Sequence, residues 1–181
     1  MRVVRVVAVL LLLLGATGFV AAQGSQSADV PALDGFSRGS AGGVDVQWRV
    51  DGDMLEVQMA ANTTGWVSVG FDPSRMMADA NMVIGYVENG EVIIADDYGT
   101  GATSHDRDTN HGGTNDVTVV DGREVDGTTI IRFTIPLDSG DEMDKALAPG
   151  NTYTALASHG PAGADDFNTY HADRGSFELE L

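Results

Sequence analysis

The chain contains no cysteine, and Lys145 is its only lysine. Without cysteine it has neither disulfides nor thiolate metal sites, so any metal or cofactor must be held by other side chains. Only 10 basic residues stand against 27 acidic ones, and the resulting net charge of −17 repels nucleic acid and anionic membranes. We also find no phosphate-binding glycine loop, nucleophile elbow or Ser-His-Asp order, so no catalytic set is predicted.

Long apolar runs are equally scarce, and the one present lies at the N-terminus. It covers residues 6–20, follows Arg2 and Arg5, and ends in small residues before Gln23. This pattern is typical of a signal peptide, although an uncleaved anchor is the alternative. We therefore predict an exported protein that is extracellular, periplasmic or held at the cell surface. The expected division of the chain is a signal peptide at 1–22, a linker and N-terminal segment at 23–42, and one domain at 43–181.

Short segments with strand character dominate the rest of the chain. Several of them alternate apolar and polar residues with a period of two, and turn signals such as Asn89-Gly90 and Asp126-Gly127 separate them. This pattern favours an all-β antiparallel sandwich. We expect an exposed loop at 97–115 and a short helical turn at 139–147. The expected strands are 44–50, 55–59, 66–71, 82–87, 92–95, 117–120, 128–135, 153–157 and 177–181.

Five short motifs occur in one order along residues 44–181. They are G-W-V-S-V-G-F at 65–71, M-A-D-A-N-M-V-I-G at 77–85, D-Y-G-T-G at 97–101, T-I-I-R-F at 129–133, and Y-H-A-D-R-G at 170–175. In this order they resemble the DOMON family, which includes the cytochrome domain of cellobiose dehydrogenase, plant auxin-responsive cytochromes and the N-terminal domain of dopamine β-monooxygenase. The fourth motif is similar to a strand that precedes an acidic family loop, here with Asp138, Asp141 and Asp144.

The resemblance implies an immunoglobulin-like antiparallel β-sandwich with a ligand pocket at one end. It also implies a site, because haem-binding members use a methionine and a histidine as the axial ligands of haem iron. Carried over, these are Met77 and His171, which would hold one non-covalent haem b. A thioether and a neutral imidazole suit iron of this kind. Tyr170 and Arg174 are then expected to contact the haem propionates.

Simpler interpretations of these residues remain open. Met77 could be ordinary core packing, and His171 could be a surface histidine. Met76 replaces Met77 if the register shifts by one residue, because successive side chains of an extended segment face opposite ways. We expect Trp66 and Phe71 in the core, and we expect Met59 and Met82 to line the pocket.

The segment 105–111 carries a separate group of possible metal ligands. His105, Asp106, Asp108 and His111 have the donor types for a transition metal or Ca²⁺, but their spacing matches no standard metal motif. The alternative is a charged loop in contact with solvent.

From these observations we predict an exported b-type cytochrome domain that is not itself an enzyme. It would transfer single electrons to or from a separate redox partner, either a membrane cytochrome or a secreted oxidoreductase. The first alternative is a haem-free DOMON module that binds a sugar or another small ligand at the cell surface. The second is a structural or interaction domain. A fold alone does not decide among these functions.

Overall fold

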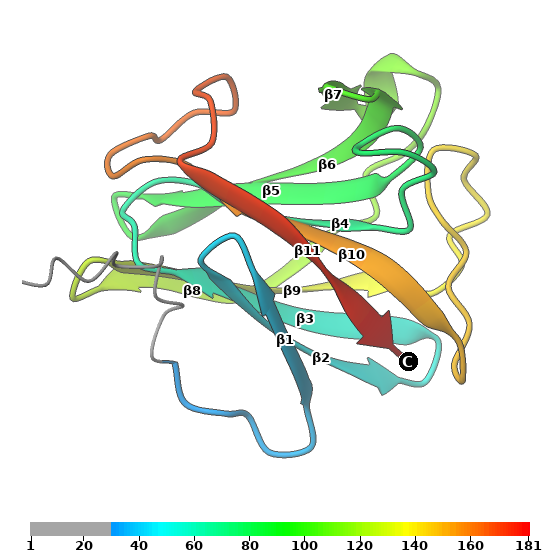
Figure 1. Cartoon of the computed structure of the whole chain (residues 1–181), viewed down its shortest axis with the longest axis horizontal. Helices are drawn as coiled ribbons and strands as arrows, with labels where there is room; N and C mark the ends of the chain where they lie inside the picture. Colours follow the sequence, from blue (N-terminus) through cyan, green and yellow to red (C-terminus); the bar gives the residue numbers. More distant parts are fainter. Residues whose placement is uncertain (1–29) are drawn as a thin grey trace, which may run out of the picture.

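The computed structural model describes residues 30–181, which form two antiparallel sheets that face each other (Figure 1). The expected signal peptide, and the linker up to residue 29, lie outside the described residues. Within residues 30–181, no helix is long and apolar enough to cross a membrane.

The two sheets contain eleven strands in all, and both sheets are antiparallel throughout. One sheet has the order β1-β2-β3-β9-β8 and consists of β1 (Ser37–Ala41), β2 (Val44–Asp51), β3 (Met54–Ala61), β9 (Thr128–Pro136) and β8 (Thr118–Val125). The other has the order β11-β10-β4-β5-β6-β7 and consists of β11 (Asp173–Glu180), β10 (Thr152–His159), β4 (Val67–Phe71), β5 (Asn81–Glu88), β6 (Glu91–Gly101) and β7 (Ser104–Arg107). The prediction of an all-β antiparallel sandwich is thus confirmed.

Two of the hairpins are closed by the turn residues that the sequence indicated. Asn89 and Gly90 join β5 to β6 with φ of 53° and 83°, and Asp126 and Gly127 join β8 to β9 with φ of 50° and 77°. Positive φ at both central residues belongs to the tight turn whose twist matches that of the flanking strands. These turns fix the register of both hairpins.

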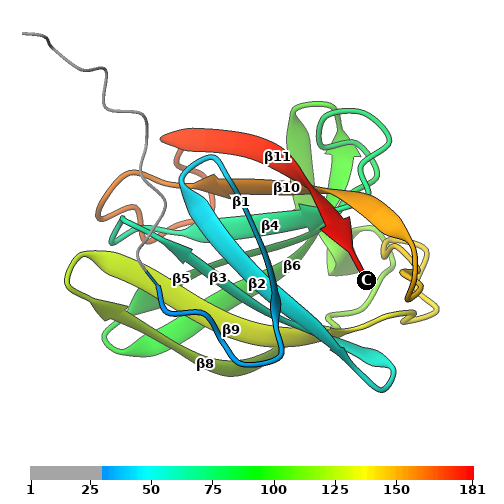
Figure 2. The ribbon, with the colours of Figure 1, turned by 60° about the horizontal axis from the view of Figure 1, so that its bottom comes forward.

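The apolar core fills the space between the sheets. Its largest fully buried side chains include Phe71, Phe133, Leu55, Met59 and Ile131. Met59 therefore packs in the core and does not line a pocket as expected. At one side of the sandwich the Trp48 Nε1 donates a hydrogen bond of 2.9 Å to the Glu180 carbonyl, which ties β2 to β11. Figure 2 shows β1 and β2 passing close to β11 on this side.

Three local features differ from the sequence prediction. The expected domain start at residue 43 lies after β1, which belongs to the expected linker and N-terminal segment at 23–42 and pairs with β2 along its whole length. The loop expected at 97–115 begins instead with the end of β6, followed by β7 and a 3-10 turn at Asp108–Asn110, and Asp97 and Asp108 within it are buried. The polar composition of residues 97–115 is typical of a solvent-exposed loop, but the side chains of Asp97 and Asp108 point into the protein.

The helical turn expected at 139–147 is absent from the structure. Two side chains bond to nearby backbone groups instead: the Asp141 N–H donates to the Ser139 Oγ at 3.1 Å, and the Met143 N–H donates to the Asp141 Oδ1 at 2.8 Å. Such local bonds compete with helix formation, which explains why this prediction was wrong.

Candidate functional site

The outer face of the six-stranded sheet forms the floor of a cavity of about 480 Å³. Alternate residues of neighbouring strands turn away from the core, as the two-residue period of a strand requires. The side chains on this floor include Trp66, Ser68, Met82, Ile84 and Leu156. The volume lies within the usual range for a small-molecule or cofactor site.

Three connections form the walls of this cavity: the β4–β5 loop, the β6–β7 hairpin and the β10–β11 loop. In Figure 1 all three lie on the side of the six-stranded sheet that faces away from the other sheet. The cavity therefore lies over this sheet face, not at an end of the sandwich. The five site residues expected from the sequence all line it: Met76, Met77, Tyr170, His171 and Arg174.

The methionine segment is held against β6 by hydrogen bonds. The Asp79 N–H donates to the Gly99 carbonyl at 2.8 Å, and the Gly99 N–H donates to the Ala80 carbonyl at 2.9 Å. The Asp79 carboxylate accepts hydrogen bonds from the hydroxyls of Ser74 and Tyr98, and these two bonds, in that order, lower the pKa of Asp79. The loop that carries the methionines is thereby attached to β6 through backbone and side-chain hydrogen bonds, and Ser74 and Asp79 link its two ends.

This segment is not extended, so its successive side chains need not face opposite ways and both methionines can face the cavity. Met76 has φ of 57° and Asp79 has φ of 61°, which gives two tight bends around Met77. Met76 and Met77 both line the cavity. They differ in burial, because Met76 is 52% exposed while Met77 is half-buried.

His171 lies on the opposite wall, just before β11. The Ala172 N–H donates to the His159 carbonyl at 2.8 Å, which fixes the chain at this point. The Arg174 Nη1 donates both to the His171 Nε2 at 2.6 Å and to the Tyr170 hydroxyl at 2.7 Å. Burial, and then the positive charge of Arg174, lower the pKa of His171. The imidazole is thus kept in the neutral form, which is the form that ligates metals.

The β10–β11 loop is anchored to Trp66. The indole Nε1 donates to the Thr169 carbonyl at 3.2 Å, and the Trp66 backbone exchanges hydrogen bonds with Gly160 and Ala164. Trp66 was expected in the core; it is buried, but it is also part of the cavity floor. In the same loop the Phe167 ring packs between Tyr86 and the Arg107 guanidinium, at centroid distances of 5.0 and 4.6 Å.

His105 is a cavity residue that the sequence interpretation missed. Its Nδ1 lies 2.6 Å from the Oδ2 of the buried Asp97, and the other carboxylate oxygen of Asp97, Oδ1, lies 3.5 Å from the Arg107 Nε. Strand register could have revealed this position. Met82 on the cavity floor pairs directly with Asp97, so the Asp97 side chain, to which His105 bonds, lies on the cavity side of β6. The structure does not bring the expected group at 105–111 together: His111 instead pairs with Asp106 at 3.2 Å near the surface, and Asp108 is buried elsewhere.

These features define an antiparallel β-sandwich domain with a largely apolar cavity on one outer sheet face. The DOMON domain model matches residues 40–160, and the chain belongs to this family. Among curated proteins, DBH-like monooxygenase protein 1 of Mus musculus is 28% identical over 137 residues, which cover 75% of this chain and 22% of the relative. The Homo sapiens protein of the same name is 29% identical over 135 residues, with 74% and 21% covered. The chain spans about a fifth of the length of these relatives.

Two solved structures share the fold. The cytochrome b domain of pyranose dehydrogenase from Coprinopsis cinerea aligns with a TM-score of 0.60 at 11% identity, covering 80% of each chain. The cytochrome domain of Myriococcum thermophilum cellobiose dehydrogenase aligns with a TM-score of 0.54 at 11% identity, covering 76% of this chain and 74% of that one.

Proposed function

We propose that this chain is an exported b-type cytochrome domain that transfers single electrons. Met77 and His171 would be the axial ligands of one non-covalent haem b. The observation that carries the proposal is that these two side chains, far apart in sequence, line the same apolar-floored cavity. Two proteins that share the fold are described as cytochrome domains, which supports the same function.

The chemistry of the cavity fits this group. Met77 offers a soft thioether and His171 a neutral imidazole, a ligand pair that raises the potential of haem iron. Trp66, Ile84 and Leu156 provide apolar surface for the flat macrocycle. Held by Met77 and His171, the haem would supply one-electron chemistry and would offer no open iron position to a substrate. The domain would therefore carry electrons and catalyse no reaction by itself.

Arg174 would then have two roles in turn. It now donates to the His171 Nε2, and ligation through that nitrogen requires this hydrogen bond to be released. The guanidinium and the Tyr170 hydroxyl, which are exposed at the cavity mouth, are then free to bind the propionate carboxylates. A guanidinium matches a carboxylate well because it can donate two parallel hydrogen bonds.

A separate redox partner is part of this proposal, either a membrane cytochrome or a secreted oxidoreductase. The net charge of −17 would attract a basic partner surface and increase the rate of encounter. High salt would weaken this effect, since charges on exposed surfaces are screened within about 10 Å at 0.1 M ionic strength.

The test uses two matched pairs of variants of the full chain. Met77→Ala and His171→Ala should each abolish the six-coordinate, low-spin absorbance spectrum of the haemin-loaded protein. Met76→Ala and His105→Ala each remove a side chain of the same type from the same cavity, and both variants should retain that spectrum. If Met76→Ala or His105→Ala abolishes it while its partner variant does not, the ligand assignment is wrong.

A second candidate is a haem-free module that binds a sugar. It is favoured by the hydroxyl and amide side chains in the same cavity, namely Ser68, Thr103, Ser158, Asn168 and Ser176. Under this alternative the purified protein is colourless, takes up no haemin and binds soluble glycans in calorimetry.

A further inference from the structure

A compact group of carboxylates lies where β6 meets two loops, on the opposite side of that strand from the cavity. Asp96 pairs with Val83, whose side chain is in the core, so Asp96 faces inward while its neighbour Asp97 faces His105. Carboxylate oxygens of Asp96, Asp108 and Asp144 all lie within 4.8 Å of one another. They come from β6, the 3-10 turn and the loop that follows β9.

Asp96 and Asp108 are buried and keep three carboxylate oxygens without a hydrogen-bond partner. Asp144 is half-buried and accepts hydrogen bonds from Asn81 and Ser139, and the Asp96 Oδ2 accepts one from the Asp116 N–H. Asp96 is 3% exposed and Asp108 is 0% exposed. Both carboxylate oxygens of Asp108 and the Oδ1 of Asp96 accept no hydrogen bond, and the same is true of the buried Asn81 Oδ1. A buried carboxylate without a partner is costly, so such a group requires a specific explanation.

No ion pair among the described residues compensates for this charge. Within the described part of the chain, the ion pairs of Arg107 and His105 go to Asp97, and none is found for Asp96, Asp108 or Asp144. Burial and the neighbouring carboxylates raise the pKa of Asp108 to about 8 and that of Asp96 to about 7. Both directions agree with carboxylates that are buried together and not neutralised.

We propose that Asp96, Asp108 and Asp144 bind a calcium ion, with the Asn81 Oδ1 as a fourth protein ligand. The donors are all oxygen atoms, which favours a hard cation over zinc or copper. Calcium takes oxygen ligands at about 2.3–2.6 Å, so ligands on opposite sides of the ion are roughly 5 Å apart. Carboxylate oxygens that lie within 4.8 Å of one another are close enough to share one ion of this size.

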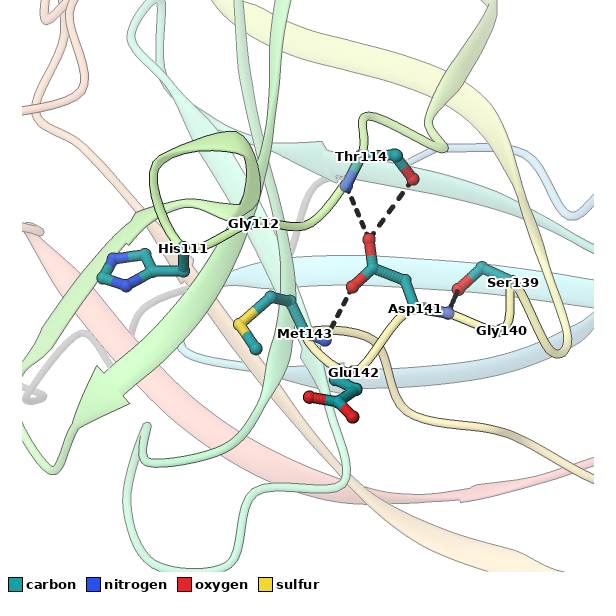
Figure 3. Close-up of a pocket in the computed structure, with 8 residues that line it drawn as sticks. All are labelled: His111, Gly112, Thr114, Ser139, Gly140, Asp141, Glu142 and Met143. Carbon is teal, nitrogen blue, oxygen red and sulfur yellow. Dashed lines mark hydrogen bonds between the residues drawn. The ribbon is translucent and has the colours of Figure 1, made fainter.

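A shallow cavity of about 390 Å³ lies between the segments 111–114 and 139–143, which flank Asp108 and Asp144 in the sequence. In Figure 3 its Asp141 carboxylate is turned toward the Thr114 backbone and hydroxyl and the Met143 N–H, so its oxygens already have donors. Asp141 and Asp116 also lie within 4.8 Å of Asp144 through their own carboxylates. They add negative charge beside the group, whereas the ion itself belongs next to the buried, unpartnered oxygens of Asp96 and Asp108.

A bound ion would join β6 to the two loops that close this end of the core. The proposal does not depend on haem, because none of its ligands lines the haem cavity. The two proposals can therefore fail separately. Haem-free protein is sufficient for the test.

The experiment titrates CaCl₂ into the full chain after removal of metals with a chelator, using calorimetry and thermal unfolding. One ion should bind per chain. At a free calcium concentration of 100 times Kd, the Tm should rise by roughly 5–10 °C, as expected for a domain of this size. Asp108→Asn should weaken binding by roughly 10- to 100-fold or more, since even outer partners of a metal site have effects of this size.

The matched control is Asp126→Asn, which removes one charge from an exposed turn where φ is 50° and asparagine fits well. Its calcium affinity should be unchanged. The chelated proteins give a second contrast: without calcium, Asp108→Asn should be at least as stable as the original chain, because an amide avoids the cost of a buried carboxyl that must either carry charge or take up a proton. A purely structural role for Asp108 predicts the reverse.

Asp96→Asn provides the same two readouts if Asp108→Asn does not fold. The proposal is overturned if calcium leaves the Tm unchanged, or if both substitutions leave the calcium affinity unchanged. Equal affinity for Mg²⁺ would overturn the assignment to calcium.

Discussion

Gly99→Ala tests how the methionine segment is positioned, because Gly99 of β6 lies directly beneath it. A methyl group at this position would overlap the Met77 carbonyl oxygen and lie 3.1 Å from the Ala80 nitrogen. Both are backbone atoms, so no change of rotamer relieves the contact and the segment must move away. The movement would strain or break the two hydrogen bonds that Gly99 makes to Asp79 and Ala80.

The expected loss of stability follows from these contacts. Two backbone hydrogen bonds contribute about 1 kcal/mol each, and overpacking costs about 1–3 kcal/mol. If part of each cost is relieved by relaxation, the free energy of unfolding should fall by about 3 kcal/mol. For a domain of this length that lowers the Tm by roughly 6–12 °C.

Gly101→Ala is the matched control in the same strand. The methyl group there meets only the Ser104 hydroxyl, which can rotate away, so the free energy of unfolding should change by less than about 1 kcal/mol. The assay is urea denaturation of both variants, followed by haemin titration. If Gly99→Ala is no less stable than Gly101→Ala, then the Met77 segment does not pack on β6 as described.

Three further substitutions separate the site from the scaffold. Arg174→Gln should change stability by less than about 0.5 kcal/mol but weaken haemin binding several-fold in a titration; unchanged affinity would contradict a propionate contact. Asp97→Asn should lower the free energy of unfolding, measured in urea, by about 2–3 kcal/mol, because it leaves His105 and Arg107 without their buried partner. An unchanged free energy would show that these two ion pairs contribute little. Phe133→Ala should lower the free energy of unfolding by about 3–5 kcal/mol, because it leaves an empty space in the core, while the folded fraction keeps the visible spectrum of the haemin-loaded protein. A changed spectrum would mean that core packing affects the ligand cavity.

The fold was largely predictable because its signals are local. Two-residue alternation marks strands such as β2 and β3, and Asn89-Gly90 and Asp126-Gly127 determine two hairpins through their own backbone preferences. The motifs also indicated which distant residues share a cavity, since Met77 and His171 line the same one.

The missed features depend on tertiary contacts. Asp97 and Asp108 have the composition of a solvated loop. The pairing of β6 with β5 and β7 places Asp97 inside the protein, and Asp108 is buried in the 3-10 turn that follows β7. His105 belongs to the cavity because the β6–β7 hairpin folds over the sheet, and its immediate sequence neighbours do not indicate that fold unless the register of β6 on β5 is known. The 139–147 segment failed as a helix because its side chains bond to their own backbone.

The most direct test of the central claim is an absorbance spectrum of the full chain exported from a haem-sufficient host, recorded oxidised and then reduced with dithionite. Haem ligated by methionine and histidine should give a strong Soret band that sharpens on reduction, together with low-spin α and β bands. A colourless protein that also takes up no added haemin would contradict the central claim, and the cavity would then belong to another small ligand.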